Sequence, residues 1–278
     1  MNVLLTGASG LIGKAIKSEL TKQGNTVYPL IRNRHEGPFV YMQENDEIFL
    51  DQSIHVDAVI NLAGANISER RWSRKVKEQI VQSRVRTTAT LSTAIANLNR
   101  KPEVYLSASA IGYYGAHSSS ILSESSPAGK DFLAQLAVDW EKATEPAQAA
   151  GIRTCLLRFG LVLSPAGGMV KNLLLPFRLA CVGPIGSGHQ MLSWISLPDT
   201  ISIMKELIKD KRLSGAINLV SGQPASSQEF ARALSKSIKR PALPKIPAVI
   251  VRMMFGEVAD AALLAGAKVA SERVSELD

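Results

Sequence analysis

Short apolar runs alternate with longer segments of helical periodicity along most of the chain. The first run, Val3 to Leu5, precedes a segment whose apolar residues recur at helical spacing until about Gly24. Later segments, Val76 to Leu98 and Phe132 to Ala150, have the same periodicity and predict helices. This alternation predicts an α/β fold, a Rossmann-like doubly wound parallel sheet covered by helices on both faces. The further strands are expected at Thr26 to Ile31, Ala58 to Leu62, Val104 to Ser107, Arg153 to Leu157 and Ile217 to Val220.

The pattern changes after about residue 163. Glycines and prolines interrupt the chain from Ser164 onward, and the part after residue 222 is helical with prolines between the helices. We therefore predict a dinucleotide-binding domain over residues 1–163, which also takes in the strand near residues 217–220, and a smaller, mainly helical C-terminal lobe over residues 164–278. Ligands of such folds bind beyond the carboxyl ends of the strands, so the substrate is expected between the two parts.

The first strand runs into a glycine-rich turn that is typical of a dinucleotide site. The first glycine permits a tight turn, the second lets the backbone approach a pyrophosphate, and the third allows close packing of helix on strand. A turn of this kind can also be a simple strand-to-helix corner, but here it lies inside a βαβ unit and opens a helix whose amides would point at phosphates. The predicted cofactor residues at this turn are Thr6, Gly7, Gly10, Leu11, Ile12 and Gly13.

The end of the second strand indicates which dinucleotide is bound. An acidic residue at this place would hydrogen-bond the free ribose hydroxyl of NAD. The chain instead has Arg32, Asn33 and Arg34, with no carboxylate before Glu36. A guanidinium can hold a 2′-phosphate with two charge-assisted hydrogen bonds. We therefore expect NADP rather than NAD, bound by Arg32 and Asn33, with ordinary solvated loop arginines as the alternative.

Composition limits the other classes of function. The chain has 278 residues, of which 46% are hydrophobic, and no apolar run approaches the length of a membrane span. It begins directly with a strand, so we expect a cytoplasmic globular protein with no membrane partner. Cys155, Cys181 and the four histidines have no metal-ligand spacing, so neither a metal nor a disulfide is expected.

The formal net charge of +8 raises the question of a nucleic-acid partner. The run from Arg70 to Lys77 is the best candidate, because it places Trp72 among basic residues. A solvated helix face explains the run equally well, and the phosphates of a cofactor account for part of the excess charge. We therefore expect no nucleic-acid partner.

Further motifs cover nearly the whole chain. They include Asn-Leu-Ala-Gly at residues 61–64, and the segments SRVRTT (83–88), SASAIGYYG (107–115), DWE (139–141), LRFGLVLSPAGG (157–168) and GPIGSGHQMLSWISLPD (183–199). In these motifs, and in RPALPKIPA (240–248) and FGE (255–257), the chain resembles the atypical, extended branch of the short-chain dehydrogenase/reductase superfamily. Within it, the chain is similar to epimerase-family proteins regarded as NAD(P)-dependent nucleoside-diphosphate-sugar epimerases. The resemblance implies that Leu62, Ala63 and Gly64 contact the cofactor, and that the C-terminal lobe lacks the family's final strand.

The resemblance also implies a catalytic serine, tyrosine and lysine. Ser109 matches the serine, which hydrogen-bonds the reacting oxygen, although it can also simply end a strand. The expected Tyr-x-x-x-Lys pair falls on Phe132 or Leu133 and on Leu136 or Ala137, and these side chains cannot transfer a proton.

Substitutes for the missing pair must come from elsewhere in the chain. Tyr114 and, less strongly, Tyr113 are the candidates, because both follow Ser109 in the loop after its strand. The alternative is that these tyrosines pack the loop against the second lobe.

Other motif positions supply candidate ligand contacts. We assign Arg158 to the cofactor or substrate site, with a structural ion pair as its alternative. Gln190, Trp194 and Asp199 are candidate substrate contacts, and the loop from Gly183 to Gly188 either approaches a ligand or acts as a hinge.

Together these features predict an NADP(H)-binding atypical short-chain dehydrogenase/reductase. It would be an epimerase or oxidoreductase of a sugar nucleotide or a small carbonyl or hydroxyl compound. A non-catalytic NADP-binding sensor or scaffold is the alternative, because the usual tyrosine and lysine are absent. Whether the chain is an enzyme stays open at this point, and a homodimer is one option for its assembly.

Overall fold

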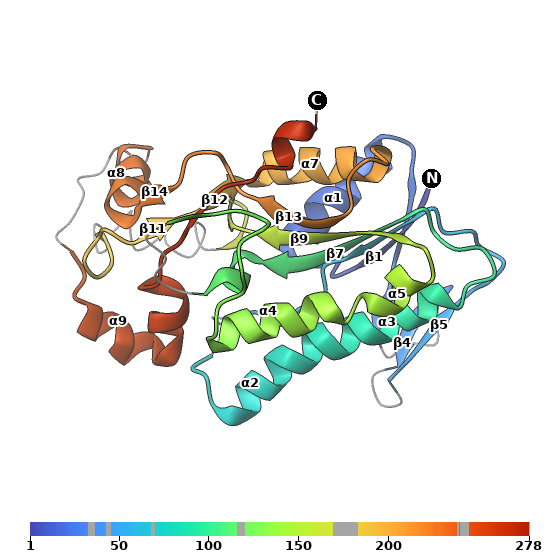
Figure 1. Cartoon of the computed structure of the whole chain (residues 1–278), viewed down its shortest axis with the longest axis horizontal. Coiled ribbons are helices and arrows are strands. Elements are labelled where there is room, and N and C mark those ends of the chain that lie inside the picture. Colours follow the sequence, from blue (N-terminus) through green and yellow to red (C-terminus); the bar gives the residue numbers. More distant parts are fainter. Residues whose placement is uncertain are drawn as a thin grey trace.

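A six-stranded parallel sheet forms the centre of the molecule (Figure 1). The computed structural model describes residues 1–32, 37–42, 46–67, 70–115, 120–168, 183–237, 239 and 245–277. The predicted α/β class and doubly wound parallel sheet are confirmed, since every strand pair of this sheet is parallel. In spatial order the strands are β13 (Gly215–Leu219), β9 (Arg153–Phe159), β7 (Val104–Ala110), β6 (Ala58–Asn61), β1 (Asn2–Thr6) and β2 (Thr26–Pro29).

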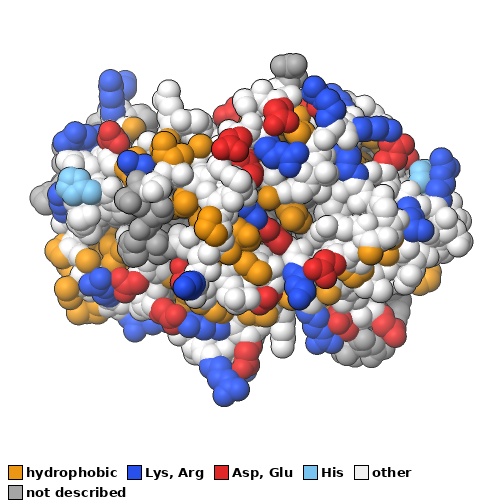
Figure 2. All heavy atoms as spheres, in the orientation of Figure 1, with side chains coloured by type: hydrophobic (Ala, Val, Ile, Leu, Met, Phe, Trp, Pro, Cys, Tyr) orange, Lys and Arg blue, Asp and Glu red, His pale blue; other side chains and the backbone are white. Residues whose placement is uncertain are grey.

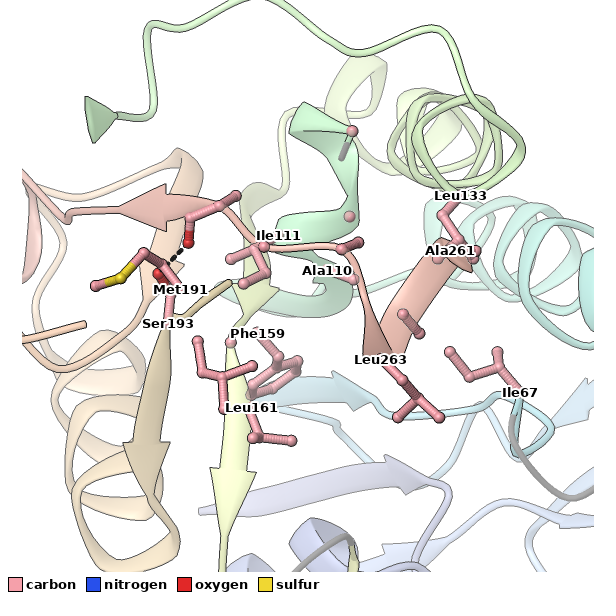
Figure 3. Close-up of a pocket in the computed structure, with 18 of the residues that line it drawn as sticks. Ile67, Ala110, Ile111, Leu133, Phe159, Leu161, Met191, Ser193, Ala261 and Leu263 are labelled. Carbon is pink, nitrogen blue, oxygen red and sulfur yellow. Dashed lines mark hydrogen bonds between the residues drawn. The ribbon is translucent and has the colours of Figure 1, made fainter. Parts of the chain in front are cut away.

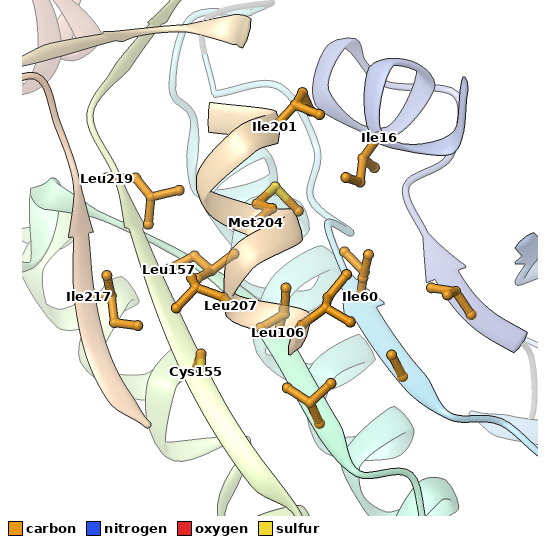
Figure 4. Close-up of a cluster of buried hydrophobic side chains, with 14 of the residues drawn as sticks. Ile16, Ile60, Leu106, Cys155, Leu157, Ile201, Met204, Leu207, Ile217 and Leu219 are labelled. Atoms are coloured by element: carbon orange, nitrogen blue, oxygen red, sulfur yellow. The ribbon is translucent and has the colours of Figure 1, made fainter. Parts of the chain in front are cut away.

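Helices cover both faces of this sheet. One face carries α1 (Leu11–Lys22) and α7 (Leu197–Lys209); the other carries α2 (Arg74–Val81), α3 (Thr87–Ala96), α4 (Phe132–Lys142) and α5 (Glu145–Ala149) (Figure 1). Side chains alternate across the sheet, so Val3 and Leu5 join the core beneath α1 and α7, with Ile16 and Met204 (Figure 4), while Leu4 joins the opposite core. Burial on both faces explains why the strands are short, nearly continuous apolar runs.

The strand order reverses beside β1. The chain leaves β1 toward β2 on one side and returns on the other side as β6. Ligands of open α/β sheets bind at such a switch point, beyond the carboxyl ends of the strands. Thr6, the last residue of β1, is in register with Asn61, the last residue of β6. The glycine turn and the Asn-Leu-Ala-Gly segment are therefore neighbours.

Smaller elements surround the central sheet. Short two- or three-stranded ladders join β3 (Ile31–Arg32), β4 (Phe39–Met42) and β5 (Glu47–Leu50); β10 (Leu161–Leu163) and β12 (Trp194–Ser196); β11 (Met191–Leu192) and β14 (Ala225–Ser226); and β8 (Ile121–Leu122) and β15 (Lys268–Val269). The C-terminal part adds α8 (Ser227–Ser237), α9 (Ala248–Phe255) and the turns η3 (Ala259–Leu263) and η4 (Val274–Glu276), and η2 (Ile111–Tyr114) follows β7. The division near residue 163 stays a prediction.

The long helix predicted over residues 76–98 is interrupted. A π-helical turn, η1 (Gln82–Arg86), separates α2 from α3, so the helix gains an extra residue in the middle. None of the helices in the described part of the chain is both long and apolar enough to span a membrane.

Candidate functional site

The glycine turn after β1 leaves no room for side chains. Gly7 has a φ of +67°, and a Cβ on it would lie 2.4 Å from the Leu62 carbonyl oxygen. A Cβ on Gly13 would lie 2.1 Å from the Gly7 carbonyl oxygen, far inside van der Waals contact. Helix α1 starts after Gly10, and within the described residues no side-chain cap hydrogen-bonds its first amides. These amides and the helix dipole form an anion site of the kind that holds a pyrophosphate.

A buried hydrogen-bond network fixes the turn against β6. The Thr6 hydroxyl donates to Asn61 Oδ1 at 2.6 Å and accepts from the Leu62 amide at 3.0 Å. The Asn61 amide nitrogen donates to the Thr88 hydroxyl at 2.7 Å. Thr6 and Asn61 therefore position Leu62, Ala63 and Gly64 beside the glycine turn.

Arg32 lies near the same edge of the sheet. The Leu30 amide donates to the Leu5 carbonyl at 2.9 Å, and Arg32 follows two residues later at the end of β3. Its side chain is exposed. Asn33, its predicted partner in phosphate binding, lies outside the described residues.

A cavity of about 400 Å³ lies between the carboxyl ends of β7 and β9 and the C-terminal elements (Figure 3). This volume is typical of small-molecule sites. Ser109 and Phe159 line it from the sheet, Leu133 and Ala137 from α4, and Leu263 from η3. The site thus lies where the sequence predicts the substrate, between the sheet and the C-terminal part.

Helix α4 presents an apolar surface to this cavity. Leu133 and Ala137, one of the two alignments of the missing tyrosine and lysine, both line the cavity. Phe132, from the other alignment, packs edge-on against Trp72 with ring centroids 5.1 Å apart. Neither Leu133 nor Ala137 can donate or accept a proton.

Ser109 connects the cavity to a buried ion pair. Its hydroxyl donates to Glu141 Oε1 at 2.6 Å, and Arg158 binds both carboxylate oxygens of Glu141 at 2.8 and 2.9 Å. Arg158 and Glu141 are only 4% and 10% exposed. Burial alone would lower the pKa of Arg158, but its hydrogen bonds and attraction to Glu141 outweigh burial and raise that pKa.

Both predicted catalytic tyrosines lie around this arginine. The Tyr114 hydroxyl donates to Asn218 Oδ1 at 2.7 Å and accepts from Arg158 at 2.9 Å, and the Tyr113 ring centroid is 3.5 Å from the guanidinium carbon. Burial raises the pKa of Tyr114. Neither tyrosine belongs to the described residues that line the cavity. A direct catalytic role of Tyr113 or Tyr114 stays a prediction. Contact of Arg158 with the cofactor also stays a prediction. The structure shows that Arg158 forms an ion pair with Glu141, which was the alternative interpretation of this arginine.

The other candidate substrate contacts lie outside the described lining of the cavity. The Gln190 amide nitrogen donates to the carbonyls of Ile185 and Leu263, at 2.9 and 3.2 Å, and so connects the glycine-rich loop to η3. Asp199 accepts from Ser196 at 2.6 Å in the N-terminal cap of α7. Trp194 is half-buried in β12.

Arg84 is a site residue to which the sequence analysis assigned no role. It belongs to the π-turn η1 and lines the cavity. A Cβ on Gly64 would lie 3.1 Å from its guanidinium carbon, which is itself 5.1 Å from the centroid of the Trp140 ring. Its spacing in the sequence could have indicated this role, because Arg84 lies four residues after Ile80 and four before Thr88, and both of these residues are buried. A charged residue on the buried face of a predicted helix marks a functional candidate.

The basic run makes contacts within the molecule. The Lys77 ammonium lies 2.6 Å from Glu257, Arg71 donates to the Met254 carbonyl at 3.2 Å, and Arg74 pairs with Glu78. On the face shown in Figure 2, basic side chains are interspersed with acidic ones.

Two further expectations concern metals and cysteines. The described residues contain no group of three or more histidine, cysteine, aspartate or glutamate side chains placed to hold a metal ion. Cys155 is buried in the sheet, and Cys181 lies outside the described residues.

A glycine turn at the switch point, followed across the sheet edge by Asn61 and Ser109, defines the class: a Rossmann-fold protein with an NAD(P)-type binding turn. The model of the NAD dependent epimerase/dehydratase family matches residues 3–219, and the chain belongs to this family.

Relatives along the full length support this assignment. The chain is 40% identical over 266 residues to the epimerase family protein Mb2239 of Mycobacterium bovis, covering 95% of this chain and 88% of the relative. It is 33% identical to human epimerase family protein SDR39U1, covering 98% and 92%. The crystal structure of human SDR39U1 (isoform 2) with NADPH superimposes with a TM-score of 0.90 at 31% identity, covering 100% of this chain and 93% of that one. The resemblance identified from the motifs is confirmed.

More distant structures share the fold alone. UDP-glucuronic acid 4-epimerase from Bacillus cereus, solved with NAD, superimposes with a TM-score of 0.73 at 18% identity.

Proposed function

We propose that this protein is an NADP(H)-dependent oxidoreductase acting on a small carbonyl or hydroxyl compound. The observation that carries the proposal is the glycine turn at the switch point, where Gly7 and Gly13 pack tightly against backbone and the start of α1 has no side-chain cap, so that its first amides can bind a pyrophosphate. The NADPH bound to the human relative supports the choice of cofactor.

The residues present fit this cofactor. The α1 amides would bind the pyrophosphate, and Arg32, exposed at the sheet edge, would bind the 2′-phosphate together with Asn33. Leu62 to Gly64 would form the adjoining wall. The cavity beyond β7 and β9 would then hold the nicotinamide and the substrate.

Bound NADPH would supply a hydride, and the chain must place the reacting oxygen and exchange a proton with it. Ser109 is the polar group at the sheet end of the cavity. Since its own hydrogen is directed at Glu141, its lone pairs are free to accept from a substrate hydroxyl. In the oxidation direction the substrate proton would pass to Ser109 Oγ as the serine proton passes to Glu141. Leu133 and Ala137 would exclude water without taking part in proton transfer.

A cofactor titration tests the proposal. Full-length protein and the Arg32→Ala variant are titrated with NADPH and NADH while nicotinamide fluorescence is followed. We expect the variant to bind NADPH about tenfold or more weakly, with NADH binding unchanged, because a charge-assisted bidentate contact to phosphate is lost.

Arg74→Ala is the matched control, since its side chain is 94% exposed. Equal affinity of the wild type for NADPH and NADH, with no effect of Arg32→Ala, would contradict the proposal.

A non-catalytic NADP(H) sensor is the second candidate. It is favoured by the apolar pair Leu133 and Ala137 in the cavity wall. It predicts tight NADPH binding without NADPH oxidation across a panel of aldehydes and ketones, and turnover of any of them excludes it. Measuring the bound cofactor after extensive dialysis distinguishes an epimerase from a reductase. An epimerase retains its cofactor between turnovers, whereas a reductase exchanges it.

A further inference from the structure

The cavity is mostly apolar. Its described lining contains mostly aliphatic and aromatic side chains, among them Ile111, Phe159, Leu161, Met191, Phe230 and Leu263. Figure 3 shows Phe159, Leu161 and Leu263 on neighbouring parts of this lining. Among the described lining residues, Arg84 is the only one with an ionisable side chain.

Ser193 and Trp140, two other polar residues of the wall, already have hydrogen-bond partners. Ser193 donates to the Ala267 carbonyl at 2.8 Å and accepts from the Val269 amide at 2.9 Å. The Trp140 ring nitrogen donates to Thr88 at 2.9 Å. By contrast, the Arg84 guanidinium makes one long hydrogen bond, 3.4 Å to the carbonyl of Ile80, and pairs with no carboxylate of the described residues.

The backbone holds Arg84 in this position. It is the central residue of η1, and π-turns inserted into helices are rare and frequent at functional sites. A second π-turn, η3, supplies Ala261 and Leu263 to the same cavity. Trp140 on one side and Gly64 on the other confine the guanidinium, so little side-chain entropy remains to be lost on binding.

A half-buried guanidinium that lines an apolar cavity without an anion is costly. Burial lowers the pKa of Arg84 to about 10, which still leaves the group charged at neutral pH. In an apolar cavity its attraction for an anion is stronger than at the surface, and its planar fork matches the two oxygens of a carboxylate.

We propose that the cavity binds an apolar molecule with one carboxylate, which pairs with Arg84 while the hydrocarbon part fills the space lined by Phe159, Leu161 and Phe230. The proposal rests on the proposed function only in assigning the reacting oxygen to Ser109. A nucleoside diphosphate sugar fits poorly, since its two phosphates and many hydroxyls would meet one cation and an apolar wall. The cofactor pyrophosphate is the competing source of an anion, because Gly64 belongs to the segment beside the glycine turn.

Binding of matched probes separates these possibilities. Octanoate, its neutral analogue octanamide, and UDP-glucose are titrated calorimetrically into the full chain, with and without saturating NADPH. We expect octanoate to bind about tenfold more tightly than octanamide, the value of one buried charge-assisted pair, and UDP-glucose to bind more weakly than octanoate. The arm without NADPH tests this proposal even if the proposed cofactor does not bind.

Variants of Arg84 test whether this residue causes the preference for octanoate over octanamide. Arg84→Gln should abolish the preference for octanoate, and Arg84→Lys should keep part of it. Arg74→Gln, an exposed arginine on the preceding helix, should behave as the wild type. NADPH affinity should stay within about threefold of the wild type in every variant.

Several results would overturn the proposal. Two of them concern the wild type: equal affinity for octanoate and octanamide, or a higher affinity for UDP-glucose than for octanoate. Two concern Arg84→Gln: a preference for octanoate over octanamide that persists in this variant, or a tenfold loss of its NADPH affinity. The last result would assign Arg84 to the cofactor. If Arg84→Gln does not fold, the pH dependence of the wild type decides instead. The preference for octanoate should then weaken as the pH rises above about 10, because burial lowers the pKa of Arg84 in the free protein to about that value.

Discussion

The ion pair of Arg158 and Glu141 shows how strand register brings polar side chains together. Arg158 of β9 is in register with Ser109 of β7 on one side and with Asn218 of β13 on the other. Glu141, on α4, completes the group by binding both Ser109 and Arg158. Four of the five guanidinium N–H groups are thereby used, because Arg158 also donates to Tyr114 and to the Glu124 carbonyl.

Breaking this pair on one side should be strongly destabilising. We expect Glu141→Ala to lower the free energy of unfolding in urea by about 3–5 kcal/mol, because a buried guanidinium loses its counter-charge. Glu78→Ala, which breaks the exposed pair with Arg74, should cost under about 1 kcal/mol. A loss for Glu141→Ala no larger than for Glu78→Ala would show that the buried pair contributes little.

At the scale of elements, two periodic segments differ from their prediction for local reasons. The helix predicted over residues 76–98 is interrupted by η1. The hydrophobic spacing did not reveal this π-turn, because it changes which side chains share a helix face and leaves the spacing in the sequence unchanged. The strand predicted over residues 26–31 is β2 followed by the separate β3, whose partner is β4 rather than β1. Hydrophobic spacing does not specify these changes of partner.

The burial of β9 between two neighbouring strands leads to a prediction about alkaline pH. Cys155 is fully buried there, and burial raises the pKa of its thiol to about 11 from 9.0. The folded state therefore holds this proton more tightly than the unfolded state, so the stabilising contribution is complete below pH 9 and is lost as the pH passes about 11.

Between about pH 8 and 11 the wild type should lose about 2 kcal/mol more unfolding free energy than Cys155→Ala, as measured by urea titration at each pH. Other titrating groups are common to both proteins and cancel in the comparison. Parallel pH profiles for the two proteins would contradict the expectation.

At the scale of the whole molecule, the cavity is shared by the sheet and the C-terminal elements. Ile185, Phe230 and Leu263 come from the later part of the chain, whereas Ser109 and Leu133 come from the earlier part. The ion pair between Lys77 and Glu257 also connects these parts. Ligand binding at this junction should therefore stabilise the molecule as a unit.

Thermal denaturation with NADPH measures this stabilisation. At about 100 times the dissociation constant, a ligand specific for the folded state adds ~2.7 kcal/mol, which corresponds to roughly 5–10 °C for a chain of this size. Arg32→Ala should show a smaller shift at the same NADPH concentration, since its affinity is lower. No shift in the wild type would argue against NADPH binding.

The sequence alone predicts the glycine turn after β1. The roles of Gly7, Gly10 and Gly13 depend on short-range backbone sterics, so their spacing after a strand predicts the turn that the structure shows. The same holds for the parallel sheet, which follows from runs of buried residues between helices. The absence of the tyrosine and lysine is also visible, because Phe132 or Leu133 and Leu136 or Ala137 stand at their expected positions.

Tertiary structure alone decided what these residues face. Tyr114 follows Ser109 in sequence, yet its hydroxyl is held between Arg158 and Asn218, and Arg84 reaches the cavity from a segment that predicts an ordinary helix. These outcomes depend on strand register, on one π-turn and on contacts between residues more than a hundred positions apart. Periodicity records whether a side chain is buried, whereas its partners are set by how distant elements pack. The sequence by itself therefore determined the fold and the glycine turn, and the packing of α4, η1 and η3 around the end of the sheet decided the chemistry of the cavity.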